Sequence, residues 1–207
     1  MHVALLGDSI LDNRAYTRGQ LDVTSHLREL LSPVPVTLCA VDGSTTSNLQ
    51  PQIRNVPSDA SHIVVSIGGN DALSNIDLLA LPVPSTTEAL SLFAERIEEF
   101  ESAYVAAIDN VLAIQRETAI CTIYNGNLNP SEAYIARILL MMFNDVILRC
   151  GFRRGLPIID LRFICTEESD YANPIEPSGS GGRKIAKAVA AWLELGHAKG
   201  PSRVVIG

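Results

Sequence analysis

Residues 3–9 read Val-Ala-Leu-Leu-Gly-Asp-Ser, and this stretch sets the first expectation about the fold. Four apolar residues in succession are typical of a strand that is buried on both faces, as in a parallel sheet. The Gly-Asp-Ser that follows predicts a tight turn, which places Ser9 at the carboxyl end of that strand. Open α/β sheets carry their ligand sites at the carboxyl ends of the strands. Ser9 is therefore the first candidate for a functional residue.

Strands and helices alternate along the rest of the chain. This alternation predicts a parallel sheet with helices on both faces, a three-layer α/β/α sandwich of the α/β class. With 207 residues and no internal repeat, a single domain over residues 1–207 is expected. The further strands are expected at residues 34–40, 63–67, 119–124 and 157–161, and the helices at residues 17–31, 48–55, 86–116, 131–149 and 183–195.

The composition narrows the classes of function. A formal net charge of -7 argues against a nucleic-acid surface. No segment approaches the roughly 18 apolar residues of a membrane span, and no basic segment precedes the first short apolar run, so a cytoplasmic location is expected. The four cysteines form no Cys-x-x-Cys pair, which argues against a structural zinc site. No metal or other cofactor is expected.

Two further motifs follow the Gly-Asp-Ser turn in order. The apolar strand at residues 62–67 ends in Gly-Gly-Asn-Asp at residues 68–71, and residues 173–177 read Asn-Pro-Ile-Glu-Pro before the last expected helix. Each motif alone is common in loops, but their order and their strand contexts together are specific. From the first strand to the closing helix, the set resembles the GDSL, or SGNH, family of serine esterases and lipases.

The resemblance implies a fold, a reaction and a site. The fold would be flavodoxin-like, with a five-stranded parallel sheet in the order 2-1-3-4-5. The reaction would be hydrolysis of a carboxylic ester bond in a small-molecule substrate, with Ser9 as the nucleophile. The oxyanion hole would consist of the backbone N–H groups of Ser9 and Gly43 and the side-chain amide of Asn70. Such donors stabilise the charge that develops on the tetrahedral intermediate.

The last motif departs from the family pattern of Asp-x-x-His-Pro. Asn173 falls on the Asp position and Glu176 falls on the His position. In one interpretation Glu176 is the base, because burial among its proline neighbours would raise its low carboxyl pKa, and Asn173 only orients it. In the other, Ser9 is not activated, and the chain binds an acyl or carbohydrate ligand while Glu176 pairs with Arg183 or Lys184.

The histidines of the chain do not obviously replace the missing base. His2 and His62 begin expected strands, at the end of the sheet opposite Ser9. His26 lies on the first expected helix, and His197 lies beyond the last one. The sequence therefore leaves Glu176 as the candidate base. It predicts neither the identity of the substrate nor the oligomeric state.

Overall fold

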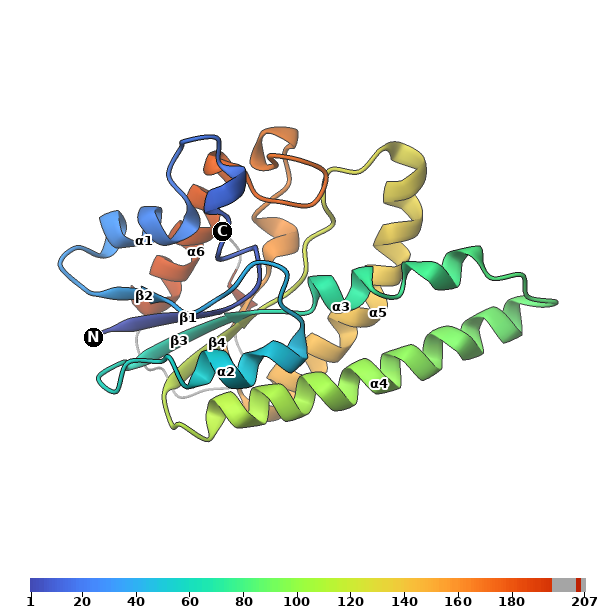
Figure 1. Cartoon of the computed structure of the whole chain (residues 1–207), viewed down its shortest axis with the longest axis horizontal. Helices are drawn as coiled ribbons and strands as arrows, with labels where there is room; N and C mark the ends of the chain where they lie inside the picture. Colours follow the sequence, from blue (N-terminus) through green and yellow to red (C-terminus); the bar gives the residue numbers. More distant parts are fainter. Residues whose placement is uncertain (195–203, 206–207) are drawn as a thin grey trace.

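The computed structural model describes residues 1–194 and 204–205, and its centre is a parallel sheet (Figure 1). The strand order is β2-β1-β3-β4-β5-β6, so the expected order of five strands is confirmed. A sixth strand of two residues, which the sequence analysis did not expect, pairs in parallel with β5. The strands are β1 Val3–Gly7, β2 Val36–Leu38, β3 His62–Ser66, β4 Glu117–Cys121, β5 Ile158–Ile159 and β6 Val204–Val205.

Helices cover both faces of the sheet (Figure 1). They are α1 Val23–Leu31, α2 Leu49–Ile53, α3 Gly69–Leu73, α4 Thr86–Leu112, α5 Pro130–Arg154 and α6 Gly179–Glu194. Short 3-10 turns are η1 Arg14–Tyr16, η2 Thr46–Asn48, η3 Ile76–Ala80, η4 Leu161–Phe163 and η5 Glu168–Asp170. The three-layer α/β/α architecture is therefore confirmed.

The apolar run of β1 supplies both cores because successive side chains point to opposite faces of a strand. Val3 and Leu5 pack in the core beneath α1 and α6. Ala4 and Leu6 pack in the second core, beneath α2, α4 and α5. All four side chains are fully buried, as the continuous apolar pattern predicts for a strand covered on both sides.

Several helix boundaries differ from those expected. The helix expected at residues 17–31 begins at Val23, because Arg18 has a positive φ of 52° and Asp22 caps the helix by accepting the Ser25 N–H at 2.7 Å. The helix expected at residues 131–149 runs to Arg154. The closing helix begins at residue 179, four residues early, and its expected end at residue 195 lies outside the described residues.

The carboxyl end of the sheet is built up by segments that extend past the strands. Helix α3, turn η3 and the first turns of α4 and α5 all lie beyond the ends of β1 and β3 (Figure 1). The sequence analysis expected no helix between residues 68 and 85, but α3 and η3 both form there. These segments form the walls around the residues that follow β1 and β3.

Gly7 should be indispensable to the fold. Its φ is 137°, and a Cβ there would lie 1.8 Å from the Ser66 carbonyl oxygen on the paired strand. We expect Gly7→Ala to lower the free energy of unfolding by about 3 kcal/mol or more, measured by urea denaturation. Gly155→Ala is the matched control. Gly155 also has a positive φ, 64°, but open space around it, so about 1–2 kcal/mol should be lost. Equal losses would contradict the steric argument.

Candidate active site

Ser9 lies in a tight turn at the carboxyl end of β1. The Asp8 N–H donates to the Ser66 carbonyl at 3.0 Å, and the Leu11 and Asp12 N–H groups donate back to the Asp8 carbonyl. Ser9 is only 6% exposed. Its Oγ donates a hydrogen bond to Glu176 Oε1 at 3.0 Å, so two residues that are 167 positions apart meet in a buried contact.

The loop that carries Glu176 is held by its own backbone and by Asn173. The Asn173 Oδ1 accepts the N–H groups of Ile175 at 2.9 Å and of Glu176 at 2.8 Å. The Glu176 carbonyl accepts the Ala172 N–H at 2.8 Å, which closes the loop. The Tyr124 hydroxyl, from the segment after β4, donates to the Ile175 carbonyl at 2.5 Å. Asn173 is itself exposed, so it orients Glu176 through the backbone.

The environment of Glu176 brings the pKa of its carboxyl group close to neutral pH. Burial raises the pKa of Glu176 from 4.5 to about 7, opposed by the hydrogen bond from Ser9 and assisted by the nearby charge of Asp42. The Oε2 atom is buried and has no hydrogen-bond partner among the described residues. Lys184, one of the two partners considered for Glu176, instead contacts Asp170 at 2.9 Å and Glu167 at 3.5 Å.

A second carboxyl group lies beside the nucleophile candidate. Asp8 is 2% exposed, and its Oδ1 accepts the Ile10 N–H at 3.1 Å. Burial is the main cause that raises the pKa of Asp8 to about 8, and the charges of Glu176 and Asp71 add to it. Two weakly acidic groups therefore flank Ser9, and Asp8 holds the turn through the Ile10 N–H.

The donors expected for the oxyanion hole come from three segments, which follow β1, β2 and β3. Asn70, the second residue of α3, lines the same cavity as Ser9 and Glu176, and its amide donates to the Ser44 carbonyl at 2.9 Å. Gly43 directly precedes Ser44 but is exposed and is not among the described residues that line the cavity. The structure thus brings Ser9, Asn70 and Glu176 together, with Gly43 on the adjoining loop.

Gln52 joins the end of β1 to the loop that carries Ser44, and the sequence analysis did not single it out. The side chain is 3% exposed and brackets Gly7: Oε1 accepts the Gly7 N–H at 2.7 Å and Nε2 donates to the Gly7 carbonyl at 2.8 Å. The same Nε2 lies 3.1 Å from the Ser44 hydroxyl, to which it donates. One glutamine in a short helix carries no sequence signal of such a role.

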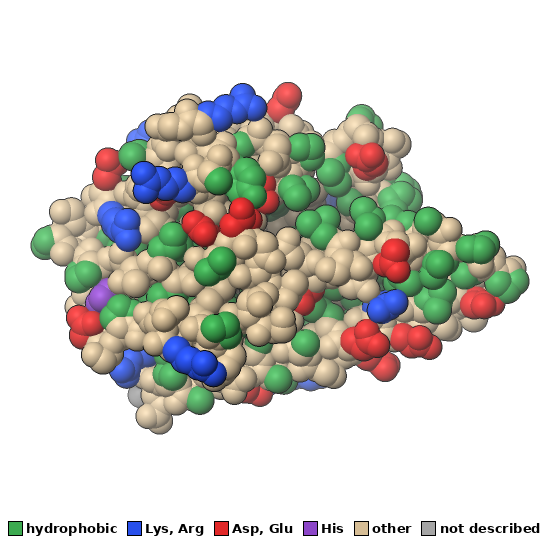
Figure 2. All heavy atoms as spheres, in the orientation of Figure 1, with side chains coloured by type: hydrophobic (Ala, Val, Ile, Leu, Met, Phe, Trp, Pro, Cys, Tyr) green, Lys and Arg blue, Asp and Glu red, His purple; other side chains and the backbone are tan. Residues whose placement is uncertain are grey.

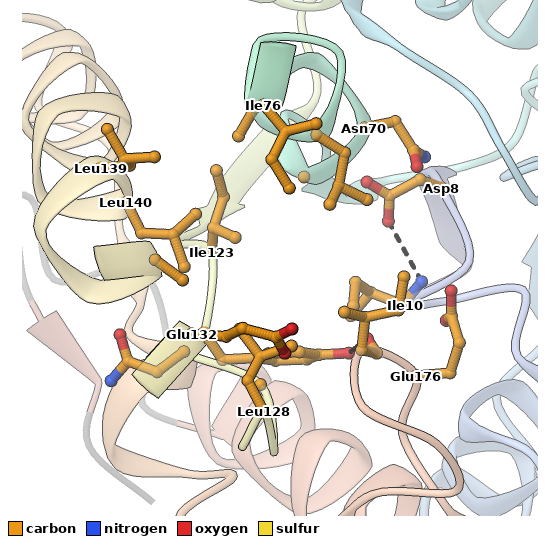
Figure 3. A pocket seen from close by; sticks show the side chains of 18 of the residues that line it. Asp8, Ile10, Asn70, Ile76, Ile123, Leu128, Glu132, Leu139, Leu140 and Glu176 are labelled. Atoms are coloured by element: carbon orange, nitrogen blue, oxygen red, sulfur yellow. Dashed lines mark hydrogen bonds between the residues drawn. The ribbon is translucent and has the colours of Figure 1, made fainter. Parts of the chain in front are cut away.

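The cavity in front of Ser9 has a volume of about 570 Å³ and two chemically different sides. Asp8, Asn70 and Glu176 lie on one side, and Leu139 and Leu140 lie on the other (Figure 3). Hydrophobic side chains also gather on the outer surface at the end of the molecule that α3, α4 and α5 form (Figure 2). The apolar wall of the cavity includes Leu73, Ile76, Leu79, Ile123, Leu128, Ile135, Leu139 and Leu140.

The histidines of the described chain lie away from this cavity. His2 and His62 are at the amino ends of β1 and β3, and the His26 Nε2 lies 3.0 Å from the Gly179 carbonyl. His197 lies outside the described residues. Within residues 1–194 and 204–205, no group of three or more His, Cys, Asp or Glu side chains is placed to hold a metal ion. No described helix is both long and apolar enough to cross a bilayer.

Comparisons with known proteins find one matching family model and several solved structures of similar fold. A model of the GDSL-like lipase/acylhydrolase family matches residues 5–183. Similar solved structures include an extracellular lipase from Streptomyces rimosus (15% identity, TM-score 0.64, covering 93% of this chain and 99% of that chain). Two further structures are also similar, each with 15% identity and a TM-score of 0.69. Phospholipase A1 from Streptomyces albidoflavus NA297 covers 92% of this chain and 98% of its own. The acetyl xylan esterase AlAXEase covers 93% of this chain and 100% of its own. At these identities the likeness is one of fold. No curated protein matches the sequence.

The bracket that Gln52 forms around Gly7 should be a main support of the site. We expect Gln52→Leu to lower the free energy of unfolding by about 1–3 kcal/mol, because it removes the acceptor of the buried Gly7 N–H. The Gly7 carbonyl loses one donor but keeps the Val41 N–H at 3.1 Å. Gln50→Leu, an exposed position on the same helix, should change stability by less than about 0.5 kcal/mol. Urea denaturation of both variants measures the difference. A loss in Gln52→Leu no larger than in the control would refute this role.

Proposed function

Because the chain belongs to the GDSL-like lipase/acylhydrolase family, we propose that it hydrolyses carboxylic esters, with Ser9 as nucleophile and Glu176 as base. The observation that carries this proposal is the buried hydrogen bond of 3.0 Å from Ser9 Oγ to Glu176 Oε1. A serine hydroxyl is a weak nucleophile until a base within hydrogen-bond reach takes its proton. Glu176 is the group within that reach.

The first half of the reaction forms an acyl-enzyme. Ser9 Oγ attacks the ester carbonyl carbon while its proton passes to Glu176. The tetrahedral intermediate carries a negative oxygen, which the Ser9 and Gly43 backbone N–H groups and the second amide hydrogen of Asn70 stabilise. Each such donor typically contributes about 2.7–4 kcal/mol to the transition state. The carbon–oxygen bond to the alcohol then breaks, and Glu176 returns its proton to the leaving alkoxide.

The second half releases the acid. A water molecule attacks the acyl-Ser9 carbonyl and gives a proton to Glu176. The second tetrahedral intermediate uses the same donors, and its collapse breaks the bond to Ser9 Oγ, which recovers its proton from Glu176. One ester and one water thus yield one carboxylic acid and one alcohol.

Glu176 suits this work because of its surroundings. A general base is most effective when its pKa lies near the working pH, and burial raises the pKa of Glu176 to about 7. A carboxylate also begins with a negative charge and becomes neutral when it takes the serine proton. It therefore needs no charged partner behind it, and Asn173 need only hold the loop.

Two substitutions test the nucleophile and the base. With p-nitrophenyl butyrate as substrate, Ser9→Ala should lower kcat by at least about 1,000-fold and Glu176→Gln by about 100-fold or more. The value of kcat/KM for the unaltered protein should rise with pH and level off above about 7, since only ionised Glu176 accepts the proton. Circular dichroism would show that the variants fold. Full activity in Glu176→Gln would exclude Glu176 as the base.

A rescue experiment separates the base from the rest of the machinery. We expect Asn173→Asp/Glu176→His to hydrolyse the same ester, because it places an imidazole with a charged partner at the two motif positions. Glu176→His alone should be slower by roughly 100-fold, since Asn173 cannot stabilise an imidazolium. If the unaltered protein is inactive and the double variant active, Glu176 is not a base and the chain is a binding protein with a competent Ser9.

A further inference from the structure

We propose that the cavity beside Ser9 holds an aliphatic acyl chain, so that the substrates are esters of medium-chain or longer fatty acids rather than acetyl or carbohydrate esters. This inference rests on the proposed function, because it names the acid half of the ester that Ser9 would attack. It depends on where the polar and apolar groups of the cavity lie.

The reacting groups and the apolar wall lie on opposite sides of one cavity. Figure 3 shows Asn70 and Glu176 on one side and Leu139 and Leu140 across from them, with Ile123 between. An acyl group bound to Ser9 Oγ has its carbonyl carbon one bond from that atom. Its chain must therefore extend away from Ser9. The lining that η3 and α5 supply there is mostly aliphatic, with Ser131 and Glu132 as its polar members.

Two separate segments supply this wall. Ile135 and Leu139 are four residues apart on α5, so they lie on one face of the helix, and both line the cavity. From the opposite segment, Leu73 of α3 and Ile76 and Leu79 of η3 line it as well. Two apolar surfaces that face one space can enclose a flexible hydrocarbon chain without any directional contact.

The side chains of this wall are only partly covered in the free protein. Ile76 is 61% exposed, Leu79 47%, Leu73 43% and Ile135 40%. Exposed aliphatic surface that borders a cavity gains free energy when an apolar ligand removes it from water. Each methylene buried this way improves binding about fourfold. An acetyl group would reach little of this wall.

The titratable residues of the cavity disfavour a charged acyl group. Asp8, Glu132 and Glu176 are its acidic lining residues, and no Lys, Arg or His is among the described residues that line it. A phosphate or a second carboxylate on the acyl chain would therefore find no counter-ion in the cavity. Sugar hydroxyls would lose hydrogen bonds to water against leucine and isoleucine side chains. An uncharged hydrocarbon chain suffers neither penalty.

The chain-length profile tests this inference. The ratio of kcat/KM for p-nitrophenyl octanoate to that for p-nitrophenyl acetate, measured with monomeric substrate, should be about tenfold or more. Leu139→Asp should lower that ratio by at least about tenfold, because it places a charge in the apolar wall. Ile138→Asp is the matched control, since Ile138 is the adjacent residue of α5, is 47% exposed and does not line the cavity. Its ratio should stay unchanged.

A binding measurement keeps the inference testable without turnover. Octan-1-ol at submillimolar concentration should raise the melting temperature of the unaltered protein, of Ser9→Ala and of Ile138→Asp, but not of Leu139→Asp, and butan-1-ol should raise none. If no ester is cleaved but octan-1-ol protects in this pattern, the hydrolase proposal fails and the chain-binding site stands. Turnover with equal use of acetate and octanoate, or equal effects of the two aspartate variants, would overturn the acyl-chain inference.

Discussion

Strands β1 and β3 approach so closely at Gly7 and Ser66 that no side chain fits between them, and the site depends on this contact. The positive φ of Gly7 turns the chain out of the sheet, so Ser9 faces the cavity instead of continuing the strand. Gln52 then satisfies both backbone groups of Gly7 and reaches Ser44, whose carbonyl receives the amide of Asn70. The turn and the adjoining loop are therefore fixed as one unit.

The loop around Glu176 is adapted to a carboxylate. In a serine–histidine pair the base becomes positively charged, and an aspartate behind it stabilises that charge. Glu176 would instead lose its charge on taking the proton, and an aspartate at position 173 would add a negative charge close to it. Asn173 gives the same kind of backbone support as an aspartate, accepting two N–H groups, without that charge. Asn173 and Glu176 are thus physically consistent with each other as neighbours in one loop.

Much of this arrangement follows from short-range patterns in the sequence. The apolar run before Ser9 predicted a doubly covered strand, and the resemblance to the family made Glu176 a candidate partner of Ser9. The sequence could not predict β6, a strand of only two residues. Nor could it predict the start of α1, which depends on the left-handed conformation of Arg18. Nor could it find the apolar wall, because hydrophobic residues surround the first half of α5 without a clear stripe. The part played by Gly43 and the cytoplasmic location stay predictions.

The two buried acids beside the turn tie the stability of the protein to pH. In the folded state the pKa of Asp8 is about 8 and that of Glu176 about 7, against 3.8 and 4.5 for the free groups. Between those limits the folded chain holds protons that the unfolded chain has released. The contribution of these two groups to stability is therefore greatest below about pH 4, falls as pH rises, and is lost once pH passes their folded pKa values of about 7 and about 8. The same ionisation that would prepare Glu176 to accept a proton therefore weakens the fold. At neutral pH the ionised form of Glu176 that would accept a proton is also the form that destabilises the folded state. The hydrogen bonds that hold the turn around Ser9 offset part of this loss of stability.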